Sequence, residues 1–75
     1  MNKTAKDILK NIYISYNSGE PFYKMKAPVP SKIHDFNMAV KEIEKYIIFI
    51  ERNMINIKIE LTNEGLEYCM ENIDI

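Results

Sequence analysis

The hydrophobic pattern of this chain changes its period near residue 46, from helical spacing to strand spacing. Before that point apolar residues recur at steps of three and four, whereas from Ile55 to Leu61 they alternate with polar residues. The first spacing places apolar side chains on one face of a helix, and the second places them on one face of a strand. We therefore expect an α+β fold whose core is formed by three helical stripes and a β-hairpin.

The first helix is predicted from Thr4 to about Tyr16. Thr4 is its expected N-cap, and Gly19 suits the left-handed position that often follows a helix. Pro21 prevents the helix from continuing further. The apolar stripe consists of Ala5, Ile8, Leu9, Ile12, Tyr13 and Tyr16.

A second helix is predicted from about Phe36 to Tyr46, with Asp35 as its N-cap. Its apolar stripe consists of Phe36, Ala39, Val40, Ile43 and Ile47. Its opposite, more polar face consists of Asn37, Met38, Lys41 and Lys45. A helix with these two faces is expected to bury the first and expose the second.

A β-hairpin and a last helix are predicted to follow. The run Ile47 to Ile50 is short, apolar and rich in β-branched residues, which is typical of a strand. It leads through a turn at 51–54, where Asn53 can take a positive φ, into the alternating strand 55–61. Thr62 is the expected N-cap of a last helix over about 63–72. Its predicted inner stripe is Leu66, Cys69, Met70 and Ile73, and its acidic outer face is Glu64, Glu67, Glu71 and Asp74.

The segment 20–34 has the weakest pattern. Pro28 and Pro30 force an extended backbone on the residues that precede them. The sequence allows a short strand at 22–24 and a single helical turn at 31–34.

Length and composition indicate one domain over 1–75, without a membrane span. The chain has 75 residues, of which 47% are hydrophobic, and its longest apolar stretch is Tyr46 to Ile50. A span needs about 20 apolar residues. The only cysteine is Cys69, which excludes an internal disulfide, and the first residues do not have the pattern of a signal peptide. We expect a cytoplasmic protein.

Charge is distributed unevenly along the chain. The net charge is −1, but residues 1–34 carry six lysines against Asp7 and Glu20, whereas residues 35–75 carry four basic and nine acidic residues. One face can therefore attract phosphate although the whole chain is nearly neutral.

The segment from Val40 to Tyr68 resembles the closing half of bacterial winged-helix domains. In those domains a helix of the form A-V-K-E-I-E-K leads into a strand, a short wing and a second strand that ends in L-T-x-x-G-x-x-Y. The matching residues here are 39–45 and 61–68, in which Gly65 is expected to permit close approach of the last helix to the sheet. The resemblance implies a small winged helix-turn-helix domain with three helices and a hairpin in its second half. Because Pro28, Val29 and Pro30 are poor helix formers, the usual first helix of the helix-turn-helix is expected to be shortened or replaced.

The resemblance implies a small DNA-binding protein, a transcriptional regulator of phage or plasmid style, whose recognition helix spans about 36–46. Such a helix lies in the major groove, where asparagine pairs with adenine edges and lysine reaches guanine or phosphate. The expected groove contacts are Asn37, Met38, Lys41 and Lys45. The expected phosphate contacts are Lys24, Lys26, Lys32 and Arg52.

Three alternatives remain open at this point. The near-neutral charge and the acidic last helix are also typical of a protein-interaction module on the same scaffold, such as a phage-type inhibitor or a complex subunit. Lys24 and Lys26 also fit an edge strand that lysines protect from pairing. Ile14 lies off the first apolar stripe, and it marks the first helix as a candidate surface for a homodimer.

We expect neither an enzyme nor a cofactor or metal site. His34 is the single histidine and has no cysteine or second histidine near it in the sequence, so it is a poor metal ligand. Cys69 lies in an apolar stripe, where a free cysteine behaves as a small hydrophobe.

Overall fold

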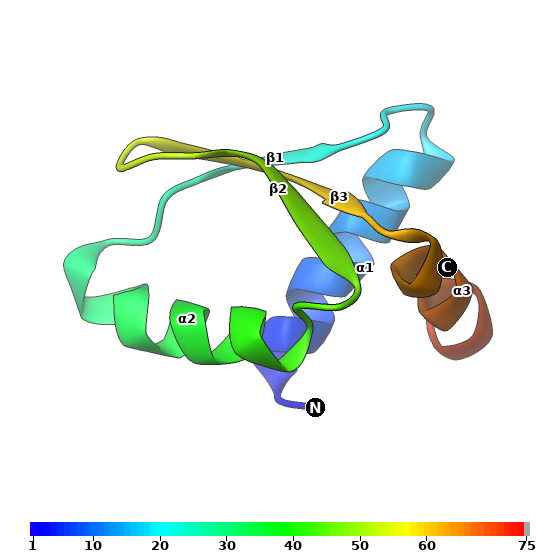
Figure 1. The fold of residues 1–75 in the computed structure, drawn as a ribbon, viewed down its shortest axis with the longest axis horizontal. Helices are drawn as coiled ribbons and strands as arrows, with labels where there is room; N and C mark the ends of the chain where they lie inside the picture. The colour runs from blue at the N-terminus through cyan, green and yellow to red at the C-terminus, as the bar shows by residue number, and fades with distance from the viewer. Residues whose placement is uncertain (75) are drawn as a thin grey trace.

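Helices cover one face of a three-stranded antiparallel sheet (Figure 1). The computed structural model describes residues 1–74, and within them the chain forms a small α+β domain. The elements in order are α1 (Lys3–Asn17), β1 (Tyr23–Lys26), the 3-10 helix η1 (Pro30–Lys32), α2 (Ile33–Glu42), β2 (Ile47–Arg52), β3 (Asn56–Leu61) and α3 (Asn63–Asn72). The predicted fold class is therefore confirmed at the level of an α+β domain with three α-helices and a hairpin.

The element order differs from the usual winged-helix order. Between β1 and α2, where the first helix of a helix-turn-helix is expected, the chain forms only η1, a turn of three residues. Residues 24–32 thus contain no α-helix. Pro28 and Pro30 are the physical reason, because each forces an extended residue before it. Val29 has the extended conformation that this requires, with φ −64° and ψ 156°.

The sheet has the strand order β1-β3-β2, so β3 is its central strand. Ile57 and Ile59 of β3 are buried, which confirms the predicted alternation. The hairpin turn at Asn53 is confirmed, but its geometry differs from the prediction, because no residue other than Gly19 has a positive φ among residues 1–74. Instead, Asn53 Oδ1 accepts hydrogen bonds from the backbone N–H groups of Ile55 and Asn56, at 2.8 and 2.7 Å.

Helix α1 begins at Lys3, and its N-cap lies two residues before the predicted N-cap. Its N-cap is Asn2, whose Oδ1 accepts a hydrogen bond from the backbone N–H of Ala5 at 2.8 Å, so Thr4 lies inside the helix. The predicted apolar stripe is buried at its centre, at Ala5, Ile8, Leu9 and Ile12. Tyr16, at its end, is exposed. Gly19 has φ +92°, as its place after the helix requires.

Helix α2 is displaced toward the N-terminus relative to the prediction of 36–46. Pro30 starts η1, and η1 leads directly into α2, so Asp35 lies in the first turn of the helix and does not cap it. The helix ends at Glu42. The chain then turns so that the carbonyl of Tyr46 accepts a hydrogen bond from the N–H of Thr62, which joins it to the sheet.

The segment 61–68 joins the end of β3 to the start of α3. Thr62 caps α3 as predicted, since its Oγ1 accepts a hydrogen bond from the N–H of Gly65 at 3.0 Å. A Cβ added at Gly65 would collide with the carbonyl oxygen of Tyr46, which confirms the predicted close approach. The predicted inner stripe of α3 is correct at Cys69 and wrong at Met70, which is 65% exposed. The reason is that α3 is a short peripheral helix that turns only its Cys69 side toward α1.

Candidate nucleic-acid interface

Helix α2 presents one solvent-facing surface made of Asn37, Met38 and Lys41. Phe36 and Ala39 on the opposite side of the helix are buried in the core, and they fix the direction in which the exposed residues point. All three candidate groove contacts are exposed. The structure therefore brings together three of the four residues that the sequence assigned to the recognition face.

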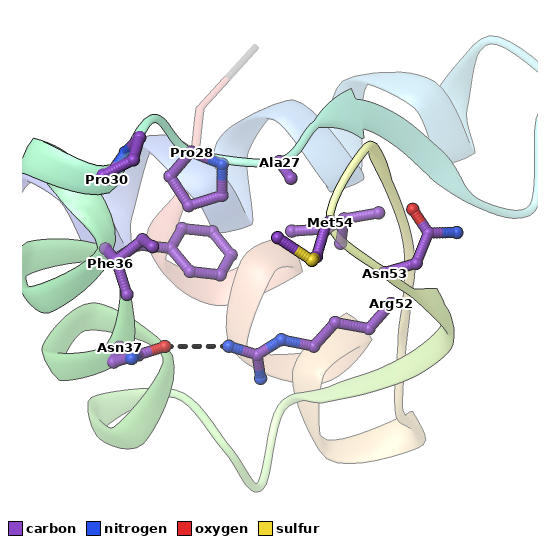
Figure 2. Close-up of a pocket in the computed structure, with 10 residues that line it drawn as sticks. Ala27, Pro28, Pro30, Phe36, Asn37, Arg52, Asn53 and Met54 are labelled. Carbon is purple, nitrogen blue, oxygen red and sulfur yellow. Dashed lines mark hydrogen bonds between the residues drawn. The ribbon is translucent and has the colours of Figure 1, made fainter.

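Arg52, at the end of β2, joins this helix to the hairpin. Its Nη2 donates a hydrogen bond to Asn37 Oδ1 at 2.8 Å (Figure 2). The guanidinium also lies over two aromatic rings, with its Cζ 4.6 Å from the ring centre of Phe49 and 5.6 Å from that of Phe36. Arginine stacks on aromatic faces and keeps its charge, so this arrangement holds the side chain in one place. Arg52 thus links the end of β2 to the α2 surface through its hydrogen bond with Asn37.

Lys45 is not part of the α2 surface. Because α2 ends at Glu42, Lys45 lies in the turn before β2, and its Nζ is 5.2 Å from the ring centre of Tyr46. Its backbone carbonyl accepts a hydrogen bond from Thr62 Oγ1 at 2.8 Å. Lys32, by contrast, is exposed at the end of η1 and stands directly before α2. It is the predicted phosphate contact that lies nearest to the α2 surface in the chain.

Lys24 and Lys26 lie on a different surface. They are exposed on β1, where Lys24 pairs with Lys58 and Lys26 pairs with Asn56. Successive side chains of a strand point to opposite faces, and the core side of β3 is given by Ile57 and Ile59. These lysines therefore point away from the helices, on the open face of the sheet. The structure separates the predicted phosphate contacts into two groups on opposite sides of the sheet.

Lys58 was not singled out by the sequence reasoning, although it belongs to the same open face. Its Nζ lies 5.1 Å from the ring centre of Phe22. The alternation of 55–61 does place Lys58 on the polar side of its strand. Its neighbours could not be predicted, because the register between β1 and β3 depends on tertiary packing.

An apolar groove of about 260 Å³ lies between α2 and the hairpin tip (Figure 2). Its walls come from η1, the start of α2, and the turn between β2 and β3. The lining residues are Ala27, Pro28, Pro30, Ile33, Phe36, Asn37, Arg52, Asn53, Met54 and Ile57. The groove thus adjoins the α2 surface, and the pair Asn37–Arg52 forms its polar side.

Two large apolar residues at the hairpin tip are exposed to solvent. Met54 is 96% exposed and Ile55 is 73% exposed. The sequence reasoning placed Met54 in a turn and Ile55 on the buried side of a strand. Ile55 is exposed because β3 begins only at Asn56, beyond the edge of the core. Two exposed large apolar residues at the end of a projecting hairpin suit contact with another molecule.

Two acidic residues border the α2 surface on its Met38 side, since Asp35 lies three residues before Met38 and Glu42 lies four residues after it. Glu42 Oε2 accepts a hydrogen bond from the backbone N–H of Asn2, so that side of the helix turns toward the start of α1. Asp35 stands seven residues before Glu42, two helical turns away, and lies on the same side. The outer face of α3 is acidic as predicted at Glu64, Glu67 and Glu71, which are exposed, whereas the exposed Asp74 lies after the end of the helix.

No metal-binding cluster is found in the described part of the chain. His34 is exposed, and residues 1–74 contain no group of three histidine, cysteine or acidic side chains placed to hold a metal ion. Burial raises the pKa of the Cys69 thiol from 9.0 to about 11, so the thiol stays protonated at neutral pH. Within the same residues, no helix combines the length and the apolar character needed to cross a membrane.

Comparisons with protein-family models, curated protein sequences and solved structures gave no match to this chain.

Proposed function

We propose that this chain is a double-stranded DNA-binding domain, a reduced winged helix that reads the major groove with α2. The observation that carries the proposal is the exposed surface Asn37–Met38–Lys41 on a helix that lies beside a projecting hairpin. An α-helix with its side chains is about 10–12 Å across, so a major groove about 12 Å wide admits it, and the ten residues of α2 extend about 15 Å along the groove.

The arrangement of elements supports this proposal. A strand precedes α2, a hairpin follows it, and the strand order β1-β3-β2 places the hairpin next to the first strand. Of these relationships, the hairpin after the helix is the one that the resemblance to winged-helix domains implies. The difference is that η1 replaces a full helix, so α2 has less support on its N-terminal side than a complete helix-turn-helix would provide.

The chemistry of the surface gives each residue a role. The Asn37 amide offers a donor and an acceptor to an adenine edge, and Oδ1 has a second lone pair when it already accepts from Arg52. Lys32 and Lys41 supply positive charge for phosphates at the two ends of the helix. Met38 offers an apolar contact to a thymine methyl group. Arg52 fixes the direction of the Asn37 side chain, which is how a supporting residue sharpens recognition.

Charge reversal at Lys41 tests the proposal, with Lys24→Glu as the matched control. Both substitutions make the same change in charge at exposed lysines, but Lys24 lies on the open face of the sheet. Lys41→Glu is expected to weaken duplex binding by about tenfold, because a phosphate contact becomes a repulsion. Lys24→Glu is expected to change it by less than about twofold by the same reasoning. Equal effects of the two substitutions would contradict the proposed surface.

A second candidate function is suggested by the exposed hairpin tip. Met54 and Ile55 stand beside the apolar groove, and a cluster of this kind is more typical of a protein-binding surface than of a phosphate-binding one. In this case the domain is a protein-interaction module on the same scaffold. The substitution pair Met54→Ser and Ile55→Ser distinguishes the two functions. It should abolish capture of a protein partner, while Lys41→Glu should leave that capture unchanged.

A further inference from the structure

The sheet has two edges, and they are protected to different degrees. At one edge β1 has only four residues, carries the exposed Lys24 and Lys26, and is followed by Pro28. Short length, lysine and proline are the features that keep an edge strand from pairing with another chain. The β1 edge is therefore guarded against association, as the sequence alone suggested.

The other edge, β2, has no such protection over its first four residues. Ile47, Ile48, Phe49 and Ile50 are all apolar, and the first charged residue is Glu51. Ile48 is 49% exposed and Ile50 is 50% exposed. In Figure 1, β2 crosses the front of the molecule with no helix in front of it, and its packing is chiefly against β3. A strand with this composition at an open edge is a template for further pairing.

The backbone of β2 offers hydrogen-bonding groups outward at Ile47 and Phe49. The Tyr46 carbonyl accepts a hydrogen bond from Thr62 N–H, so the backbone groups of Tyr46 point toward β3. In an antiparallel pair these groups alternate in direction along the strand. Ile48, which pairs with Glu60, therefore also points its backbone groups toward β3, while those of Ile47 and Phe49 point to the open edge.

We propose that the β2 edge pairs with the β2 edge of a second copy of this chain, in an antiparallel ladder centred on Ile48. The outward groups are symmetric about Ile48, so Ile47 of one copy bonds Phe49 of the other, and the reverse. Such a symmetric, self-complementary contact is the usual basis of a twofold dimer. The two three-stranded sheets then form one continuous sheet of six strands, and this inference does not depend on DNA binding.

Charge favours a second copy of this chain as the partner that pairs with the β2 edge. Lys45 stands just before the strand and Glu51 near its end, so antiparallel pairing places opposite charges at both ends of the ladder. Ile48 faces Ile48 of the second copy on the open side of the sheet. The register irregularity between Phe49 and Glu51 ends the regular ladder after three paired residues, Ile47 to Phe49. Because a domain of this size buries a small core, the added apolar contact also stabilises the fold.

Disulfide trapping tests the pairing directly. In a non-hydrogen-bonded antiparallel pair the Cα atoms are about 4.5 Å apart, within the range of about 4.4 to 6.8 Å that a disulfide spans. Ile48→Cys is expected to give a covalent dimer under mild oxidation. Lys26→Cys on the β1 edge and Ile14→Cys on α1 are expected to stay monomeric, as is the unchanged chain with its buried Cys69. If Ile14→Cys or Lys26→Cys gave as much covalent dimer as Ile48→Cys, the proposal would be overturned.

Sedimentation of the full chain supplies the second test. The unchanged protein is expected to sediment as a dimer at high concentration, and Ile48→Lys is expected to sediment as a monomer, because like charges would face each other across the ladder. Since Ile48 is half exposed on the open face, the lysine variant is expected to keep its circular dichroism spectrum. A monomeric unchanged protein would overturn the proposal, and so would a folded Ile48→Lys variant that remains a dimer.

Discussion

The guanidinium of Arg52 donates a 2.8 Å hydrogen bond to the side-chain oxygen of Asn37, and so links the end of β2 to the exposed face of α2. The two residues are fifteen positions apart in the chain, and the sequence reasoning assigned them separate contacts with DNA. In the structure they form one unit, in which Arg52 is held by Phe49 and Phe36 and in turn orients Asn37.

This pair gives a measurable coupling between helix and hairpin. In a double-mutant cycle with Arg52→Ala and Asn37→Ala, we expect a coupling of about 0.5–1 kcal/mol in the free energy of unfolding. The value is modest because both side chains are exposed. Urea denaturation of the four proteins measures it. Strictly additive effects of the two substitutions would show that the hydrogen bond is not formed in solution.

Gly65→Ala is expected to destabilise the domain strongly. The added methyl group would meet the backbone carbonyl of Tyr46, which cannot rotate away as a side chain does. We expect a loss of about 3 kcal/mol or more in the free energy of unfolding, at the upper end of overpacking effects. Glu67→Ala is the matched control, since Glu67 is exposed in the same helix, and it should change stability by less than about 0.5 kcal/mol.

Thr62→Ala and Thr4→Ala compare two predicted N-caps. The structure shows Thr62 as the N-cap of α3 and places Thr4 inside α1. Thr62 accepts a hydrogen bond from Gly65 N–H and donates one to the Lys45 carbonyl, so its loss should cost about 1–2 kcal/mol of stability. Thr4 lies inside α1, and Thr4→Ala should change stability by less than about 0.5 kcal/mol. Thermal denaturation at one pH compares them. A larger loss at Thr4 would mean that α1 begins at Thr4, as the sequence suggested.

Cys69 is expected to make stability fall at high pH. Burial raises the pKa of its thiol from 9.0 to about 11 in the folded chain. Below pH 9 the thiol is protonated in both states, whereas between pH 9 and pH 11 the unfolded chain loses the proton first, so unfolding becomes more favourable. The stability advantage of the unchanged protein over Cys69→Ala should therefore shrink across this range, as measured by urea denaturation. A constant difference between the two proteins would contradict a buried thiol.

The existence of each long element could be predicted from hydrophobic spacing. The stripe of α1, the alternation of β3 and the cap at Thr62 are local patterns, and each is present in the structure. The boundaries of α2 were predicted less well. Its stripe of apolar residues continues past Glu42 through Ile43 to Ile47, but these two residues are buried from a turn and a strand, which gives the same spacing.

The candidate site depended on contacts that no local pattern contains. Spacing placed Asn37, Met38 and Lys41 together, because they lie on one helix. It could not show that Arg52 reaches Asn37. It also could not show that Lys24 points to the opposite side of the sheet, because both facts follow from the register and packing of the strands. The exposed Ile55 was likewise missed, since alternation alone does not show where the buried part of a strand begins.

The most direct test of the central claim uses fluorescence anisotropy to measure the binding of the unchanged protein to a random-sequence duplex at low and at moderate salt. With the two phosphate contacts proposed for Lys32 and Lys41, the logarithm of the binding constant should fall with the logarithm of salt concentration with a slope of about −2, starting from micromolar affinity at about 50 mM salt. That result would support DNA binding by the domain. The absence of binding at the lower salt concentration would contradict it, and would favour the protein-interaction function instead.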